Sequence, residues 1–483
     1  MKNKLKRVCL LFIILPAFFS CASYRMKLTG YYNSIGHADY READKQLSDN
    51  GFLQHDRNKL LYYMEKGKLY HLMGSYDSSN LYFNMADNFI DMRKRSGKDV
   101  LVGNLLNPMM QTYLGEDHER FLLHYYKALN YLYKGSIEDA VVEARRITLS
   151  EYSQQQKFKP NAKRYTEDAF ALMVQGMIYE TAGDINNAFI SYRNAADLYL
   201  DAPDRTYYGV RLPEQLKSDV LRTADQLGFT EEVDVYQRKL NRSFEKKPSC
   251  DGGELIVFFE KGMAPVKTEQ NYILTKNGNG SSDFIFTNEL GTFNVPFDYG
   301  YANRSRSEVS LDKFRTVRVA IPGYAPREYN NTLGVAIVDG ARKNSEMAED
   351  INTLAPAILK ERMVKEVSSA LVRQVVKKLT EAGASAAVKE VSKNNSKEKD
   401  ETKKESKAET ASLITGLVVN MFNTATEKAD TRNWQSLPAY IEYVRVPLQK
   451  GENSITLQMG NQVKTVSVEG TGKLQMYNWI VSR

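Results

Sequence analysis

Hydrophobic and polar residues follow different periods in successive parts of the chain. Between Leu60 and Leu240 the pattern predicts paired helices separated by glycine turns. Beyond Phe244, short β-branched and aromatic runs such as ELIVFFE and TVRVAIP are separated by Gly, Asn, Asp and Pro, which is typical of antiparallel strands. The chain therefore predicts an α + β protein whose first part is helical.

The helical part repeats one signature of small, aromatic and glycine positions. The signature begins with a small residue, which is followed by an aromatic residue after three positions and by a glycine after another four. A second small residue comes five positions after the glycine, a second aromatic residue four positions after that, and a last small residue after three more. The first copy is Gly67, Tyr70, Gly74, Ser79, Phe83 and Ala86, and the third is Gly176, Tyr179, Gly183, Ala188, Tyr192 and Ala195. The second, Ala128, Tyr131, Gly135, Ala140, Ala144 and Ile147, keeps the turn glycine and loses the later aromatic. Each copy predicts a helix that ends at its glycine, followed by a second helix that packs back on the first.

These positions resemble tetratricopeptide repeats. That repeat is normally about 34 residues long, whereas the copies here begin at Gly67, Ala128 and Gly176, so the array must carry insertions. A fourth, decayed copy is predicted at 221–240, with Gly228 at its turn. The bland alternative is an ordinary helical domain whose glycines and tyrosines match by chance.

The resemblance also implies which side chains line a concave, peptide-binding groove. They are Met64, Lys68, His71, Leu72, Tyr125, Leu129, Tyr133, Met173, Met177 and Glu180. Methionine and tyrosine suit an adaptable contact surface, and they equally suit a groove filled by the chain itself. The apolar insertion from Leu101 to Leu114 could plug this groove or help to bind a partner, and we favour self-packing because large exposed apolar patches are uncommon.

The N-terminus has the pattern of a secretion signal. Four basic residues within 2–7 precede the apolar run from Val8 to Phe19, which is too short to span a bilayer permanently. Ser20 followed by Cys21 resembles the lipobox of bacterial lipoproteins, which implies that Cys21 carries the lipid. We expect an outer-membrane anchor that faces the periplasm; an uncleaved anchor or an ordinary secretory signal is the alternative.

Charge and cysteine content argue against nucleic-acid binding and against an internal disulfide. The chain has 66 basic and 59 acidic side chains, and four of the basic ones lie in the leader, so the balance does not argue for nucleic acid. Once Cys9 leaves with the leader and Cys21 is lipidated, Cys250 remains alone, and no internal disulfide can form.

The second half predicts strands interrupted by helices. Apolar residues from Ile351 to Leu379 recur at helical spacing, 389–409 is polar and charged, and Leu413 to Phe422 forms a second apolar helix. We infer that the last strands complete the sheet begun at Glu254. The expected divisions are a signal peptide at 1–20, a tether at 21–50, a repeat domain at 51–245, a β-sandwich at 250–340 and 435–483, and a helical hairpin at 345–427 with a disordered linker at 385–410.

Motifs for catalysis or metal binding are absent from the sequence. The histidines, His37, His55, His71, His118 and His124, lack metal-ligand spacing and are expected at partly exposed surface positions. Neither a G-x-S-x-G elbow nor a phosphate-binding loop occurs. The acidic residues Glu116, Asp117 and Glu119 could bind a cation, but a helix start explains them better. We expect no enzymatic activity, cofactor or metal.

Several segments together resemble an uncharacterised family of tetratricopeptide-bearing bacterial lipoproteins, among them LLYYMEKGKLYHLMGSYDSS, YLGEDHERFLLHYYKALNYLYKG and ADTRNWQSLPAYIEYVRVPL. Members are often encoded beside lipoproteins similar to the curli secretion channel, which implies an envelope-assembly role and a partner of that kind. The expected function is a non-catalytic scaffold that binds an envelope protein. Alternatives are a peptidoglycan or glycan hydrolase with paired carboxylates, and a pore-associated component in which 413–422 inserts into the membrane.

Overall fold

The computed structural model describes most of the chain. The described residues are 24–92, 108–155, 164–246, 250–276, 284–288, 291–295, 316–327, 329, 332–362 and 428–481. The predicted signal peptide, Cys21, the linker at 385–410 and the helix at 413–422 lie outside these residues. The protein is a mixed α + β molecule, as predicted.

The helices come first along the chain and the strands dominate the second half. The helices are α2 (Tyr24–Gly36), α3 (Tyr40–Ser48), α4 (Gly51–Gln54), α5 (Lys59–Leu72), α6 (Tyr76–Met92), α8 (Asp117–Tyr133), α9 (Ile137–Gln155), α10 (Ala169–Thr181), α11 (Ile185–Asp201), α12 (Glu214–Gln226) and α13 (Thr230–Leu240), with short turns η2 (Asp56–Asn58), η3 (Pro108–Met110) and η4 (Pro203–Arg205). A further helix covers 351–362. None of the described helices is long and apolar enough to cross a bilayer.

The strands form three four-stranded sheets and one small hairpin. They are β1 (Thr206–Tyr207), β2 (Val210–Arg211), β3 (Gly253–Lys261), β4 (Val266–Lys276), β5 (Phe284–Asn288), β6 (Gly291–Val295), β7 (Thr316–Ala325), β8 (Val335–Val338), β9 (Ala341–Asn344), β10 (Glu346–Asp350), β11 (Tyr440–Pro447), β12 (Gly451–Met459), β13 (Gln462–Gly470) and β14 (Lys473–Val481). The strand orders are β10-β11-β3-β14, β13-β12-β8-β9 and β6-β5-β4-β7.

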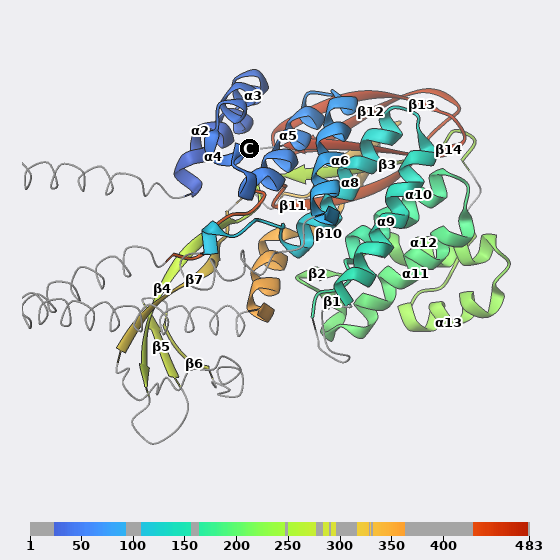
Figure 1. The fold of residues 1–483 in the computed structure, drawn as a ribbon. Helices are drawn as coiled ribbons and strands as arrows, with labels where there is room; N and C mark the ends of the chain where they lie inside the picture. The colour runs from blue at the N-terminus through green and yellow to red at the C-terminus, as the bar shows by residue number, and fades with distance from the viewer. Residues whose placement is uncertain are drawn as a thin grey trace, which may run out of the picture.

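Four helical pairs, α5/α6, α8/α9, α10/α11 and α12/α13, follow one another across the front of the molecule (Figure 1). Their turns share one hydrogen-bond pattern, in which a backbone N–H after the glycine donates to the carbonyl of Tyr70, Tyr131, Tyr179 or Ala224, at 2.8 to 3.0 Å. The turn glycines have φ between 71° and 82°, a left-handed conformation that glycine adopts without strain. This pattern is the Schellman motif, and it places the three predicted tyrosines in equivalent positions.

In two pairs a glycine of the first helix lies directly against a ring of the second helix. A Cβ atom built on Gly67 would lie 2.5 Å from the ring of Phe83, and one on Gly176 would lie 2.6 Å from the ring of Tyr192. Both rings are completely buried. Glycine therefore lets the second helix of each pair place a ring directly against the backbone of the first.

Two of the four C-terminal strands, β11 and β14, join the sheet of β3, as predicted, whereas β12 and β13 belong to the sheet of β8 and β9. β11 pairs antiparallel with β3 along one edge, and β14 pairs parallel with β3 along the other. The prediction of a purely antiparallel sheet is therefore wrong for this sheet, because β14 returns to β3 in the same direction. Apolar side chains of β3 and β11, such as Val257 and Val444, pack against those of β8 and β12, such as Ala336 and Leu457.

The other face of the β3 sheet packs on the helices. Phe258 of β3, Tyr443 of β11 and Met476 of β14 belong to the same hydrophobic core as the helical pairs. The predicted boundary between 51–245 and 250–340 thus separates helices from strands, but the two parts share one core. The sheet of β4 to β7 projects from this body (Figure 1).

Two expected boundaries are wrong. Residues 24–50 do not form a tether, because α2 buries Tyr24, Tyr31 and Tyr32 in the main core. The helical hairpin expected from residue 345 begins only at Ile351, since 346–350 pairs with β11 as strand β10. In both segments, 24–50 and 346–350, packing against distant parts of the chain decides the structure, and the local sequence pattern does not.

Candidate functional site

The ten predicted groove residues lie together, but they do not line an open groove. Seven of them are buried, namely Met64, Lys68, His71, Tyr125, Leu129, Met173 and Met177, and Leu72, Tyr133 and Glu180 are partly buried. The chain's own β3 and β14 contact Lys68, His71, Tyr125 and Tyr133, so the buried members of this set are not available to a partner. Residues 101–107 of the insertion lie outside the described residues, and its described end is buried against the chain itself: Thr112 and Tyr113 lie near Arg432, which donates to the carbonyl of Gln111.

One carboxylate of the sheet explains why the groove is closed. Glu260 of β3 is completely buried, and its oxygens accept hydrogen bonds from Tyr125 at 3.0 Å and Tyr126 at 2.6 Å. Lys68 Nζ lies 2.9 Å from Glu260 Oε2. Burial alone would raise the pKa of Glu260, but Lys68 and His71 hold it below its ordinary value. The polar members of the predicted groove are thus satisfied internally.

A second set of polar contacts joins β14, at the edge of the β3 sheet, to the helices. The backbone N–H of Asn478 on β14 donates to the hydroxyl of Tyr133 at 2.8 Å. The Asn478 side chain lies 3.0 Å from His71 Nε2 and donates to Glu260 at 2.6 Å. Burial lowers the pKa of His71 to about 4, with Lys68 adding to the effect, so its ring is neutral near neutral pH. This ring serves packing and hydrogen bonding.

A cleft opens where the helical layer and the sheet separate. Its volume is about 1000 Å³, and its walls come from the α10–α11 turn, α12, the segment 242–246 and the first residues of β3 and β14. Glu180 is the only predicted groove residue that lines it. We call this space the end cleft, and its size makes it a candidate binding site.

Two arginines and two carboxylates, Glu180 and Glu254, line the floor of the end cleft, and both arginines also pair with Asp219, which does not line it. Arg445 of β11 contacts Glu180 at 2.6 Å, Asp219 at 3.0 Å and also Glu254, and Arg222 of α12 contacts Glu180 at 2.8 Å. Burial alone would raise the pKa of Glu180, but the two guanidinium groups lower it to about 2. Glu180 therefore stays ionised and paired with both guanidinium groups, while exposed lysines such as Lys473 stand at the rim.

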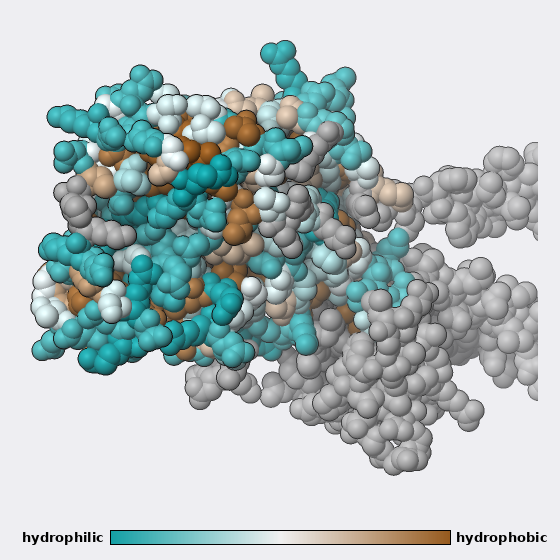
Figure 2. Space-filling view, turned by 180° about the vertical axis from the view of Figure 1, so that it is seen from behind, coloured by the Kyte–Doolittle hydropathy of each residue, from teal (hydrophilic) through white to brown (hydrophobic). Residues whose placement is uncertain are grey.

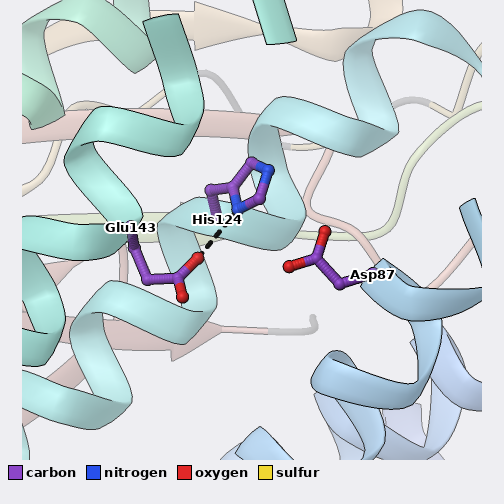
Figure 3. Close-up of side chains that lie close together, drawn as sticks. All are labelled: Asp87, His124 and Glu143. Carbon is purple, nitrogen blue, oxygen red and sulfur yellow. Dashed lines mark hydrogen bonds and ion pairs between the residues drawn. The ribbon is translucent and has the colours of Figure 1, made fainter. Parts of the chain in front are cut away.

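A second candidate is a buried cluster of metal-ligand type. Ligand atoms of Asp87 on α6, His124 on α8 and Glu143 on α9 lie within 4.8 Å of one another (Figure 3). His124 Nδ1 lies 2.8 Å from Glu143 Oε2. Geometry of this kind could hold a divalent ion of the zinc class.

Lys127 already supplies a positive charge to this cluster. The ammonium group of Lys127 lies 2.6 Å from Asp87 Oδ2 and 2.9 Å from Glu143 Oε1, and Arg146 lies 2.8 Å from Asp87 Oδ2. Burial alone would raise the pKa of Asp87, but His124, Lys127 and Arg146 hold it below its ordinary value. We therefore interpret the cluster as an ion-pair network that joins three helices.

The expectation of surface histidines is wrong for three of the five. His71, His118 and His124 are buried, whereas His37 and His55 are exposed. The helical spacing of His124 and Lys127, which places both on one face of α8, is the signal that could have indicated a shared acidic partner. The acids at 116–119 mark a helix start, as predicted: Glu116 and Glu119 form a capping box at the beginning of α8.

Comparisons with models of known protein families, with curated proteins and with solved structures found no match. The geometry of the chain itself is therefore the basis for a functional proposal. The view of the molecule from behind shows hydrophilic side chains over most of the surface, with hydrophobic residues in separate patches between them (Figure 2). This distribution favours polar recognition on that face.

Proposed function

We propose that the protein is a non-catalytic lipoprotein, anchored through Cys21 to the outer membrane, that binds another envelope protein at the end cleft. In this proposal the four helical pairs are irregular tetratricopeptide-like repeats and the two packed sheets form a β-sandwich. A lipoprotein similar to the curli secretion channel is the proposed kind of partner. The support for the anchor and the compartment comes from the N-terminal sequence pattern.

The end cleft is the observation that carries the binding proposal. It replaces the closed groove as the place for a partner segment, because it is large and is lined by both the helices and the sheet. β14 stands at the edge of its sheet, and its first residues, Lys473 and Leu474, line the cleft. An edge strand beside an open cleft suits the addition of an extended segment, which gains main-chain hydrogen bonds there.

The charges of the cleft suit a segment of mixed charge. Because Arg222 and Arg445 are held by carboxylates of the protein, the floor offers paired charges and hydrogen-bonding groups. The rim adds the ammonium of Lys473, which is exposed. A partner segment would then contribute acidic side chains at the rim and backbone groups along β14.

Site-specific photocrosslinking in cells tests this proposal. A photoreactive residue at Lys473, at the mouth of the cleft, should yield one discrete adduct with an envelope protein in the membrane fraction. The matched control is Val463, which is 62% exposed on β13 at the edge of the other sheet. The same adduct from both positions, or none from Lys473, would contradict binding at the end cleft.

The hydrolase alternative requires two carboxylates in a cleft that admits a sugar. Asp168 and Glu349 are a carboxylate pair, but the cavity that they line has a volume of about 10 Å³. A space of this size holds a water-sized particle and no sugar ring. We therefore retain the scaffold function as the proposal that the geometry supports best.

A further inference from the structure

A small cavity lies between the helices and the sheet, and it shares no lining residue with the end cleft. Its volume is about 10 Å³, which is roughly the space for one water-sized particle. Its lining includes Asp168 at the start of α10, Glu349 of β10 and the rings of Tyr199, Tyr207 and Tyr208. We call it the tyrosine cavity.

Glu349 lines this cavity, and its carboxylate has no hydrogen-bond or ion-pair partner among the described residues. Its side chain is 7% exposed, and it lies where the pairing of β10 with β11 shifts register. The hydroxyl of Tyr199, a residue only 1% exposed, also has no hydrogen-bond partner within the described part of the chain. Two buried oxygen groups thus line the cavity without a partner.

Asp168 brings a second buried carboxylate to the same cavity. One of its oxygens accepts the backbone N–H of Ala171 at 2.8 Å, as the cap of α10, and the other accepts the hydroxyl of Tyr165. No lysine or arginine of the described residues forms an ion pair with Asp168 or Glu349. Burial is the main cause that raises the pKa of both groups, and the charge of Asp168 raises the pKa of Glu349 further.

Two buried carboxylates without a counter-charge are unfavourable, because desolvation penalises each charge and the two repel. The protein must neutralise them with a proton or with a cation. A cation explains more of the observed lining, since a proton shared by the carboxylates would leave the Tyr199 hydroxyl and the space itself without a role. Oxygen donors alone, with a combined charge of −2, match a hard divalent ion.

We propose that the tyrosine cavity is a calcium site, in which Glu349, Asp168 and the Tyr199 hydroxyl supply the ligand oxygens. Calcium fits better than magnesium, because calcium accepts irregular oxygen coordination, whereas magnesium demands octahedral geometry and gives up its water reluctantly. The ion would connect the first turn of α10 to β10 and so join the helices to the sheet.

The approach to the cavity runs past the β1–β2 hairpin. Tyr207 and Tyr208 are partly exposed, and their rings meet at right angles with centroids 4.8 Å apart. Tyr208 and Gly209 both have positive φ, and a Cβ on Gly209 would lie 2.8 Å from Thr353. This tight turn holds the two rings over the cavity.

Thermal unfolding of the full chain, treated with a chelator and then titrated with calcium chloride at pH 8, tests the proposal. Calcium should raise Tm by about 2 °C or more, and the rise should disappear in Glu349→Gln and shrink in Tyr199→Phe. It should also vanish near pH 5, where protons neutralise the carboxylates. Terbium, a calcium substitute that emits when excited through nearby tyrosines, should luminesce with wild type and not with Glu349→Gln.

Glu151→Gln is the matched control. Glu151 is also buried, and burial, together with Glu167 and Asp168, raises its pKa to about 8, but it does not line the cavity. This variant should keep the full calcium response. An unchanged Tm of wild type with calcium, together with a higher Tm of Glu349→Gln at pH 8, would overturn the calcium site and assign neutralisation to a proton. If Glu349→Gln does not fold, an undiminished calcium response in Tyr199→Phe would also overturn the proposed ligand set.

Discussion

At the scale of single residues, the main feature of this molecule is its buried ion pairs. Lys68 with Glu260, Lys127 with Asp87 and Glu143, and Arg445 with Glu180 and Asp219 all lie at joints between elements. Such pairs contribute little net stability over an apolar replacement, but loss of one partner leaves a buried charge uncompensated. Their positions at the joints make each of them a sensitive point of the fold.

Replacement of Lys127 by methionine tests this interpretation of the Asp87–His124–Glu143 cluster. The change keeps the length of the side chain and removes the ammonium group that contacts both carboxylates. We expect the free energy of unfolding to fall by about 3–5 kcal/mol, measured by urea denaturation. Lys134→Met, at the C-terminal cap of the same helix, is the control: Lys134 pairs with Asp77, whose side chain is 82% exposed, so loss of that pair should change the stability little. Equal losses in the two variants would show that Lys127 has no special role.

At the scale of the elements, the sequence predicted the helical pairs well. Glycine, tyrosine and small residues at fixed spacing are local features, and they specify a turn and a close helix contact without help from the rest of the chain. The turns at Gly74, Gly135, Gly183 and Gly228 share one hydrogen-bond pattern for this reason. The strand at 346–350 was missed because its partner, β11, lies far away in the sequence.

The close contact between Gly176 and Tyr192 gives a prediction at this scale. In Gly176→Ala the new methyl group would meet the Tyr192 ring at 2.6 Å, so α10 and α11 must separate or the ring must move. We expect a loss of about 1–3 kcal/mol in the free energy of unfolding, from overpacking. Gly51→Ala serves as the control, because a Cβ at Gly51 meets nothing within 4 Å. A Gly176→Ala protein as stable as Gly51→Ala would contradict the tight packing of this pair.

At the scale of the whole molecule, the candidate site could be predicted only in part. The alignment of the repeats grouped the ten residues of one helical face correctly, and these residues do meet in space. It could not show that β3 and β14 cover this face, because Glu260 and Asn478 are distant in sequence and carry no local signal. The end cleft and the tyrosine cavity were missed for the same reason: both are formed between the helices and the strands.

The shared core gives a prediction for fragments. Residues 24–246 expressed alone would expose the apolar face that normally packs on Phe258, Tyr443 and Met476, and would leave Lys68 without its carboxylate. We expect this fragment to lack a cooperative thermal transition and to bind a hydrophobic dye, both measured against the full chain. A fragment that unfolds cooperatively with native helix content would show that the helical pairs are an independent domain.

The position of β3 between two strands from the end of the chain also constrains how the protein is made. Tyr24, near the beginning of the described chain, donates to the carbonyl of Asn433, and β14 ends at Val481. The first helix and the central strand can therefore reach their native packing only after the last residues have been synthesised. Premature termination in the final forty or so residues should yield a product that quality-control proteases remove, even though every repeat and every turn glycine is intact.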